Sequence, residues 1–319
     1  MLPGTHRDAI EGLLAMIDLQ DRYRGVLLGL ACGDALGGPV EFKSRDEIIG
    51  LHPGGLRDFV GGGWLSLSPG EITDDTQMTL AIARSLAERP SLDMNDIAAR
   101  FLEWLHSEPK DIGLTTRAAL QALDRGIPWD EAGTHVTGYA SGQSAGNGAV
   151  MRCAPVALRF RSDLSALDQA SRDTARITHA DARCQAAAVA INRSIAHLLA
   201  DAPIETLVES VLSVIDEPET REALRKAPGL ERHQVRSGGF VLDTMQSALW
   251  SFLKHGDLES TVIEAVNLGA DTDTTGAVAG ALAGARYGAS AIPERWISQV
   301  QHRDELIALA DRLLELSER

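Results

Sequence analysis

Hydrophobic residues recur along most of the chain at the spacing of an amphipathic helix. Such faces are formed by Met78, Ile82 and Leu86, by Ile97, Phe101, Trp104 and Leu105, and by Leu306, Leu309, Leu313 and Leu316. Residues three and four apart share one side of a helix, so each set predicts a helix with one buried face. Strand-like alternation is almost absent, and only the piece from Trp64 to Leu67 hints at an extended segment. The pattern therefore predicts an all-α protein.

Two rows of glycines repeat at every fourth position. The first row is Gly25, Gly29 and Gly33, and the second is Gly276, Gly280, Gly284 and Gly288. Glycine inside a helix costs about 1 kcal/mol relative to alanine, so such rows are unfavourable unless close contact requires them. We expect two neighbouring central helices whose backbones approach along these rows. The alternative is that the glycines lie in loops.

Composition, net charge and cysteine content argue against several kinds of protein. The 319 residues carry a net charge of −15, with 44% hydrophobic and 24% charged residues. This balance is typical of a soluble cytoplasmic enzyme, and it argues against a partner that is nucleic acid or an anionic membrane. Cys32, Cys153 and Cys184 have neither the number nor the spacing of a disulfide framework or a zinc site. We read no signal peptide, and no apolar tract reaches the length of about 18 residues that a membrane span needs.

Two segments concentrate acidic and hydroxyl side chains. Thr73-Asp74-Asp75-Thr76 precedes one helical pattern, and Asp271-Thr272-Asp273-Thr274-Thr275 opens the second glycine-rich helix. Helix capping explains one or two acids at each place, but it does not explain this density at both. Four carboxylates gathered together would repel one another unless cations lay between them. Because Mg²⁺ and Mn²⁺ prefer oxygen ligands, a two-metal site is the better interpretation.

A third segment, Ser144 to Arg152, is rich in small residues. Such a loop can present successive backbone N–H groups to a phosphate, although an ordinary turn is the alternative. It lacks the Lys-Ser/Thr ending of a P-loop, which disfavours hydrolysis of a nucleoside triphosphate.

Taken together, these motifs resemble the ADP-ribosylglycohydrolase family, and within it the members specific for arginine. The matching stretches, in the order of the family, are Gly29 to Gly37 with Glu41-Phe42, Gly61 to Gln77, Asp111 to Gly113, Ala145 to Cys153, Ile177 to His179, Val241 to Gln246, and Val266 to Gly288. The resemblance implies a compact, single-domain helical fold over residues 21–319 with a central binuclear metal cleft. Residues 1–20 precede the usual start of the family and are expected to form an N-terminal extension.

The resemblance also implies roles for individual residues. Those expected to bind two divalent cations, Mn²⁺ or Mg²⁺, are Thr73, Asp74, Asp75, Asp271, Asp273 and Thr274. Glu41 and Asp111 are expected to serve as acid/base residues at the ribose. Those expected to bind ADP-ribose are Gly146, Asn147, Gly148, Met151, His179 and Phe240, the last at a position where a tyrosine is expected. Without the resemblance, Glu41 would be read as a surface acid, His179 as a core histidine and Asp111 as a helix cap.

The activity implied is hydrolysis of the N-glycosidic bond between ADP-ribose and a protein arginine, so the expected partners are an ADP-ribosylated protein and ADP-ribose. Asp111 would either activate water or assist opening of the ribose ring. Two alternatives stay open. One is a glycohydrolase of another linkage, such as ADP-ribosyl-serine, or of a toxin-modified target. The other is a non-catalytic module that binds ADP-ribose or a partner.

Overall fold

Helices make up the framework of the part of the chain that the computed structural model describes, residues 19–137 and 145–317. No strand occurs in these residues, which confirms the predicted all-α fold. Gly62 and Leu67, at the segment that hinted at extended structure, form only an isolated bridge. One continuous hydrophobic core runs from α2 to α18, so the described residues form a single domain.

The helices, with 3-10 turns (η) between them, are α2 (Leu19–Gly37), η1 (Gly38–Val40), α3 (Arg45–Leu51), α4 (Asp74–Glu88), α5 (Met94–His106), α6 (Leu114–Asp124), α7 (Trp129–Ala132), α8 (Thr134–Thr137), α9 (Ala154–Phe160), α10 (Leu164–Arg176), α11 (Ala182–Leu199), η2 (Ile204–Thr206), α12 (Leu207–Leu212), α13 (Pro218–Lys226), η3 (Ala227–Gly229), η4 (Arg232–Gln234), α14 (Val241–Lys254), α15 (Leu258–Val266), α16 (Thr272–Tyr287), η5 (Ala289–Ala291), α17 (Glu294–Ile297) and α18 (Arg303–Ser317).

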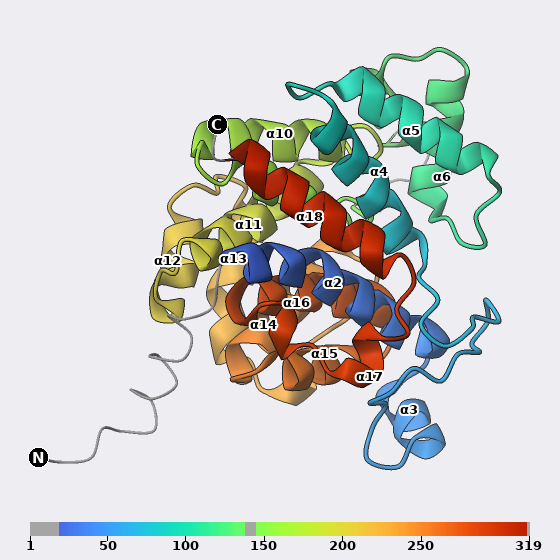
Figure 1. Cartoon of the computed structure of the whole chain (residues 1–319), viewed down its shortest axis with the longest axis vertical. Helices are drawn as coiled ribbons and strands as arrows, with labels where there is room; N and C mark the ends of the chain where they lie inside the picture. Colours follow the sequence, from blue (N-terminus) through green and yellow to red (C-terminus); the bar gives the residue numbers. More distant parts are fainter. Residues whose placement is uncertain (1–18, 138–144, 318–319) are drawn as a thin grey trace, which may run out of the picture.

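The centre of the molecule is the contact between α2 and α16, which lie against each other in antiparallel directions (Figure 1). A Cβ atom added to Gly29 would lie 2.3 Å from the carbonyl oxygen of Gly280, and one added to Gly280 would lie 2.0 Å from that of Gly29. The predicted pairing of the two glycine rows is thus confirmed, because no larger residue fits at this distance. Gly288 differs from the other glycines of its row because it lies at the C-cap of α16 and not inside the helix, with a φ of 78°.

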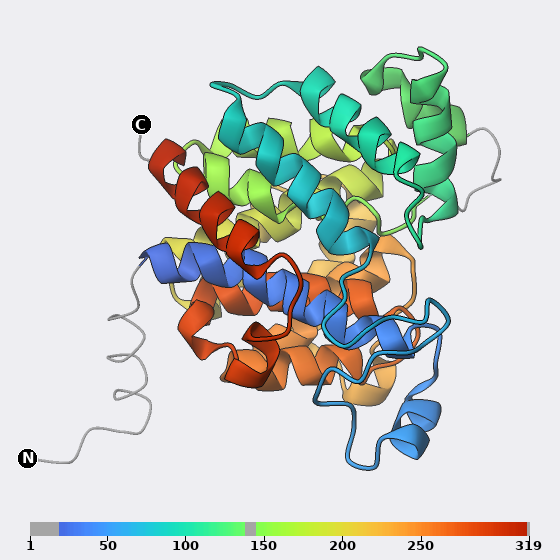
Figure 2. The ribbon, with the colours of Figure 1, turned by 45° about the vertical axis from the view of Figure 1, so that its right-hand side comes forward.

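Other helices cover this central pair on all sides. Helices α11, α14 and α15 pack against α16, and α18 crosses α2 from the opposite side (Figure 2). Helices α4, α5 and α6 form an adjoining group. The hydrophobic faces read from the sequence are buried here, with Met78 and Ile82 of α4, Phe101 of α5, and Leu306 and Leu313 of α18 inaccessible to solvent.

Three helix ends meet at one place. The last residue of α2, Gly37, lies so close to the start of α16 that an added Cβ would be 2.4 Å from the backbone nitrogen of Asp273. One turn earlier, Asp34 of α2 accepts hydrogen bonds from Thr73 and Thr76 at the start of α4. The C-terminal end of α2 therefore brings together the two acidic segments.

No single helix in the described ranges is long and apolar enough to cross a membrane. The segments Leu19–Val40 and Arg45–Leu51 meet the length and composition criteria only as a pair bent by 86°, and α2 itself is a core helix. Of the expected extension, residues 1–18 lie outside the described part of the chain, and residues 19 and 20 begin α2. The extension stays a prediction.

Candidate active site

The two acidic segments converge in the folded chain. The residues expected to bind cations, Thr73, Asp74, Asp75, Asp271, Asp273 and Thr274, are contributed by the starts of α4 and α16. The hydroxyl groups of Thr73 and Thr274 each lie 3.5 Å from the same carboxylate oxygen, Oδ2 of Asp75. A threonine 199 residues away in the sequence thus contacts the first segment.

Helix capping does not account for these side chains. Thr73 and Asp271 occupy the N-cap positions of α4 and α16, but neither side chain makes a capping hydrogen bond. The hydroxyl of Thr73 instead donates to Asp34 at 2.8 Å, which leaves its oxygen lone pairs free to face the acidic cluster.

The acidic cluster fits divalent cations. Asp75 Oδ1 and Asp271 Oδ1 are buried and have no hydrogen-bond partner, which is costly for a carboxylate unless a cation takes that place. Burial, together with the neighbouring carboxylates, raises the pKa of Asp74, Asp75 and Asp273 well above its ordinary value. Carboxylate and hydroxyl oxygens are the ligands that Mg²⁺ and Mn²⁺ prefer, so the residues present suit these ions.

Asp34 was not singled out in the sequence, although it lies inside one of the matched stretches. Its carboxylate is inaccessible to solvent and accepts from the backbone N–H and the hydroxyl of both Thr73 and Thr76. Burial raises the pKa of Asp34 to about 6, although these hydrogen bonds counteract the shift. A lone acid in the otherwise apolar run from Leu27 to Gly37 was the signal that could have revealed it.

Glu41 and Asp111 lie beside the acidic cluster. One carboxylate oxygen of each and one of Asp273 lie within 4.8 Å of one another, a group that could hold a metal ion. Glu41 accepts a hydrogen bond of 2.7 Å from Trp64 Nε1. Burial, followed by the nearby acids, raises the pKa of Glu41 to about 8, and burial also raises the pKa of Asp111. Asp111 does not cap α6, because Gly113 occupies that N-cap.

A first cavity, of about 280 Å³, adjoins these acids. Gly146, Asn147, Gly148, Met151 and His179, five of the six residues expected to bind ADP-ribose, line it together with Glu41, Asp111, Asp74, Asp75, Asp271, Asp273 and Thr274. The structure therefore brings the expected binding loop and most of the acids to one opening.

The hydrogen bonds of Asn147 and the position of Phe240 describe the surroundings of the expected binding loop further. The backbone N–H of Asn147 is bonded to the carbonyl of Gly239, and its side-chain amide donates to Asp271 and Thr244, so these donors are engaged within the protein. Phe240 is not among the residues that line the first cavity, although its neighbour Gly239 is. The guanidinium of Arg183 lies 5.5 Å from the centre of the Phe240 ring.

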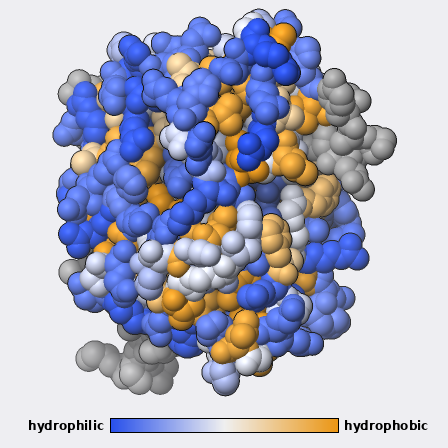
Figure 3. All heavy atoms as spheres, turned by 90° about the vertical axis from the view of Figure 1, so that its right-hand side faces the viewer, coloured by the Kyte–Doolittle hydropathy of each residue, from blue (hydrophilic) through white to orange (hydrophobic). Residues whose placement is uncertain are grey.

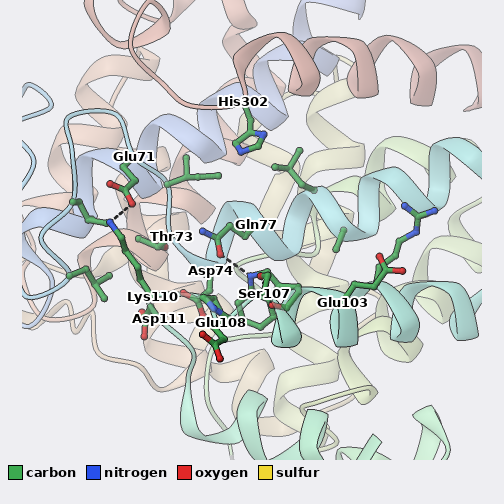
Figure 4. Close-up of a pocket in the computed structure, with 18 of the residues that line it drawn as sticks. Glu71, Thr73, Asp74, Gln77, Glu103, Ser107, Glu108, Lys110, Asp111 and His302 are labelled. Atoms are coloured by element: carbon green, nitrogen blue, oxygen red, sulfur yellow. Dashed lines mark hydrogen bonds and ion pairs between the residues drawn. The ribbon is translucent and has the colours of Figure 1, made fainter. Parts of the chain in front are cut away.

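A second cavity, of about 570 Å³, borders Asp74 and Asp111 as well (Figure 4). Helices α4 and α5 and the loops before α4 and α6 form its walls. Its cations are paired, Lys110 with Glu71, Arg84 with Glu305, and Arg100 with Glu88 and Asp96. Glu103 and Glu108 form no ion pair within the described ranges. The face of the molecule shown in Figure 3 is mainly hydrophilic, with apolar patches between the hydrophilic side chains.

Comparison with known proteins gives consistent matches over nearly the whole chain. The family model described as ADP-ribosylglycohydrolase matches residues 15–319. The chain is 38% identical over 304 residues to the ADP-ribosyl-[dinitrogen reductase] glycohydrolase of Rhodospirillum rubrum, covering 94% of this chain and 97% of that one. It is 36% identical over 307 residues to the ADP-ribosylarginine hydrolase Tri1 of Pseudomonas putida, covering 92% and 78%.

A solved structure described as an ADP-ribosylglycohydrolase-related protein complex superposes with a TM-score of 0.81 at 36% identity, covering 94% of this chain and 99% of the other. The family match, the similar sequences and the shared fold agree. The chain belongs to the ADP-ribosylglycohydrolase family.

Proposed function

We propose that this hydrolase splits the N-glycosidic bond between ADP-ribose and an arginine side chain of a modified protein. The observation that carries the proposal is that Glu41, Asp111 and Asp273, whose carboxylate oxygens lie within 4.8 Å of one another, line the same cavity as Gly146, Asn147, Gly148 and Met151. Support comes from the family, and from two relatives whose names specify ADP-ribosyl-[dinitrogen reductase] and ADP-ribosylarginine. Hydrolysis at the anomeric carbon needs carboxylates at such a position.

Two divalent cations, Mn²⁺ or Mg²⁺, fit the proposed ligands Thr73, Asp74, Asp75, Asp271, Asp273 and Thr274. When bound, they would supply the positive charge that binds ribose oxygens and polarises water. The chain holds this set in place through Asp34, which fixes Thr73, and through Asn147, which donates to Asp271.

Asp111 is the residue proposed to transfer the proton at the anomeric centre. It is partly buried beside Glu41 and Asp273, and burial raises its pKa above the ordinary value, a shift in the direction that suits a general acid or base. Glu41 supports it from beside it, where Trp64 Nε1 fixes the orientation of the Glu41 carboxylate. Both routes, activation of water and opening of the ribose ring, use Asp111 in this position.

The two cavities suggest which part of the substrate binds where. The first is lined by the loop residues Gly146 to Gly148 and the buried His179, which we assign to the nucleotide, whereas the second presents the carboxylates of Glu103 and Glu108, which would attract a cationic protein segment. The protein segment around the modified arginine therefore extends toward the second cavity. Glu108→Lys should lower the turnover of a modified protein but leave that of free ADP-ribosyl-arginine unchanged. Equal loss on both substrates contradicts this placement.

The decisive experiment compares arginine-linked and serine-linked ADP-ribosyl peptides, with Mn²⁺ or Mg²⁺ present, by measuring released ADP-ribose. We expect much faster release from arginine, and ADP-ribosylated dinitrogenase reductase serves as the protein substrate. Equal or faster release from serine rejects arginine specificity. No release from any of these substrates rejects the proposed reaction.

A further inference from the structure

Arg152 is a buried cation without a carboxylate partner in residues 19–137 and 145–317. Its Nη2 donates to the hydroxyl of Thr178 at 2.6 Å, and its Nη1 lies 3.4 Å from the sulfur of Met78. Its guanidinium carbon lies 4.7 Å from the centre of the Phe101 ring. Asp74 and Asp75 act on Arg152 only through space, without a hydrogen bond, and burial lowers its pKa to about 10, so this position needs a reason other than packing.

Thr178 links Arg152 to the next residue, His179. A guanidinium only donates, so the Thr178 oxygen must accept from Arg152. The same oxygen lies 2.7 Å from His179 Nδ1. Thr178 is inaccessible to solvent, and no other acceptor for its proton occurs in the described residues, so the hydroxyl must donate to Nδ1. An Nδ1 that accepts carries no proton, and the neutral ring then carries its proton on Nε2.

His179 lines the first cavity, and the Nε2 edge of its ring lies against the loop glycines. A Cβ added to Gly146 would lie 3.3 Å from Nε2, and one added to Gly148 would lie 2.6 Å from Cε1. The two glycines therefore let the loop approach the imidazole. His179 is buried but lines this cavity, and no protein acceptor is bonded to Nε2 in the part of the chain that is described, so a ligand in the cavity is the acceptor that Nε2 lacks.

We propose that Arg152 and Thr178 are positioning residues that hold His179 neutral with its proton on Nε2, so that Nε2–H donates to an oxygen of bound ADP-ribose. The proposal rests on the proposed function, since it takes ADP-ribose as the ligand of the first cavity. Nothing in the proposed mechanism otherwise uses Arg152 or Thr178. The arrangement supplies a hydrogen-bond donor whose direction is fixed before the ligand arrives, which lowers the cost of binding.

Burial, with a contribution from the charge of Arg152, keeps His179 from taking up a second proton near neutral pH. Burial, and then the positive charge of Arg152, lower the pKa of His179 to about 3, whereas Asp181 acts weakly in the opposite direction. His179 therefore stays neutral across the physiological range, and a ring whose Nδ1 accepts from Thr178 and whose Nε2 carries the proton has no free lone pair to act as a general base.

The test is nitrogen NMR of the histidine rings in ¹⁵N-labelled protein, with Mg²⁺ present because Mn²⁺ is paramagnetic. In the wild type we expect His179 to be neutral and protonated on Nε2 between about pH 5 and pH 8, where an ordinary histidine titrates. A proton on Nδ1, or a doubly protonated ring in this range, overturns the proposal without any variant. Calorimetric titration with ADP-ribose is the second measurement.

Thr178→Val keeps the shape of the side chain and removes the hydroxyl. We expect the proton of His179 to distribute between both nitrogens, and the Kd for ADP-ribose to rise about 3- to 10-fold, the usual range for one hydrogen bond. Thr178→Ser should retain the wild-type tautomer and affinity.

The matched control is Thr174→Val, which removes an equally buried hydroxyl that donates to the carbonyl of Ala170. If Thr178→Val leaves both readouts at the wild-type values, the proposal is wrong. Because neither readout requires hydrolysis, failure of the reaction is distinguishable from failure of this arrangement.

Discussion

At the scale of single residues, the acids of the site are of two kinds: some line the cavity, and Asp34 is buried behind the acidic cluster. Asp111 and Glu41 face the opening, where burial and neighbouring acids shift their pKa upward. Asp34 lies behind the acidic cluster and accepts from four donors of Thr73 and Thr76. Residues of the first kind are suited to proton transfer, and Asp34 is suited to holding proposed ligands in place.

Asp111→Asn keeps the size of the side chain and removes its acid/base function. We expect turnover of an arginine-linked substrate to fall about 10²- to 10⁴-fold, the usual contribution of a positioned acid or base. ADP-ribose affinity, measured by calorimetry, should change little. The control is Asp124→Asn at the far end of α6, which should leave turnover unchanged. A loss of bound Mn²⁺ in Asp111→Asn would instead identify Asp111 as a metal ligand.

Asp34→Asn replaces a carboxylate, which has two acceptor oxygens, by an amide with one acceptor oxygen and one NH₂ donor. Thr73 and Thr76 still present four donors to it. We expect the affinity for Mn²⁺ to fall about 10- to 100-fold, as for other groups that orient metal ligands. The free energy of unfolding should fall by about 1–3 kcal/mol, because buried donors lose their partner. Asp46→Asn, the same change on the exposed surface of α3, is the control. Unchanged Mn²⁺ affinity contradicts the role of Asp34.

At the scale of elements, the contact between α2 and α16 both builds the core and positions the site. The glycine rows bring the backbones together, and the same helices carry Asp34 at the end of α2 and Asp273 at the start of α16. A change in their separation therefore moves the two acidic segments relative to each other.

Gly29→Ala tests this contact. The added methyl group would lie 2.3 Å from the carbonyl oxygen of Gly280, which is backbone and cannot rotate away. We expect the free energy of unfolding to fall by about 1–3 kcal/mol or more, measured by denaturant titration, and Mn²⁺ affinity to fall with it. Gly50→Ala in α3 is the matched control, because its Cβ would meet nothing within 4 Å. That variant should be neutral or more stable by about 0.5–1 kcal/mol. Equal stability of both variants contradicts the close contact.

At the scale of the whole molecule, charge is the dominant feature. The chain carries a net charge of −15, and its site gathers acids where we propose that an anionic nucleotide binds. Cations bound to the acidic cluster would offset this repulsion, so metal binding, stability and pH are expected to be linked.

Divalent cations should raise the Tm, and more so at pH 8 than at pH 6. At about 100 times its Kd, a ligand that binds only the folded protein adds about 2.7 kcal/mol to the free energy of unfolding. Without cations, burial raises the pKa of Glu41 to about 8 from an ordinary 4.5. A raised carboxyl pKa favours folding below pH 4.5, and this contribution is lost as the pH rises through 8.

His179 has the opposite effect on the pH dependence of stability. Its pKa is lowered to about 3, so it lowers the free energy of unfolding only as the pH falls below 6.5, the ordinary pKa of a histidine. Thermal unfolding with and without Mn²⁺ at both pH values checks the prediction, with Asp75→Asn as the variant that should respond less. A pH-independent shift contradicts it.

The sequence by itself determined the helical class, the glycine rows and the two acidic segments, because periodicity and residue chemistry are local properties. The motif order also indicated the family, which the comparisons confirmed. The roles of individual site residues stay predictions. Only the tertiary structure decided which side chains meet: Asp34 behind Thr73, Trp64 on Glu41, and Arg152 behind His179. These contacts join residues whose spacing in the chain carries no periodic signal, since they depend on how helix ends pack.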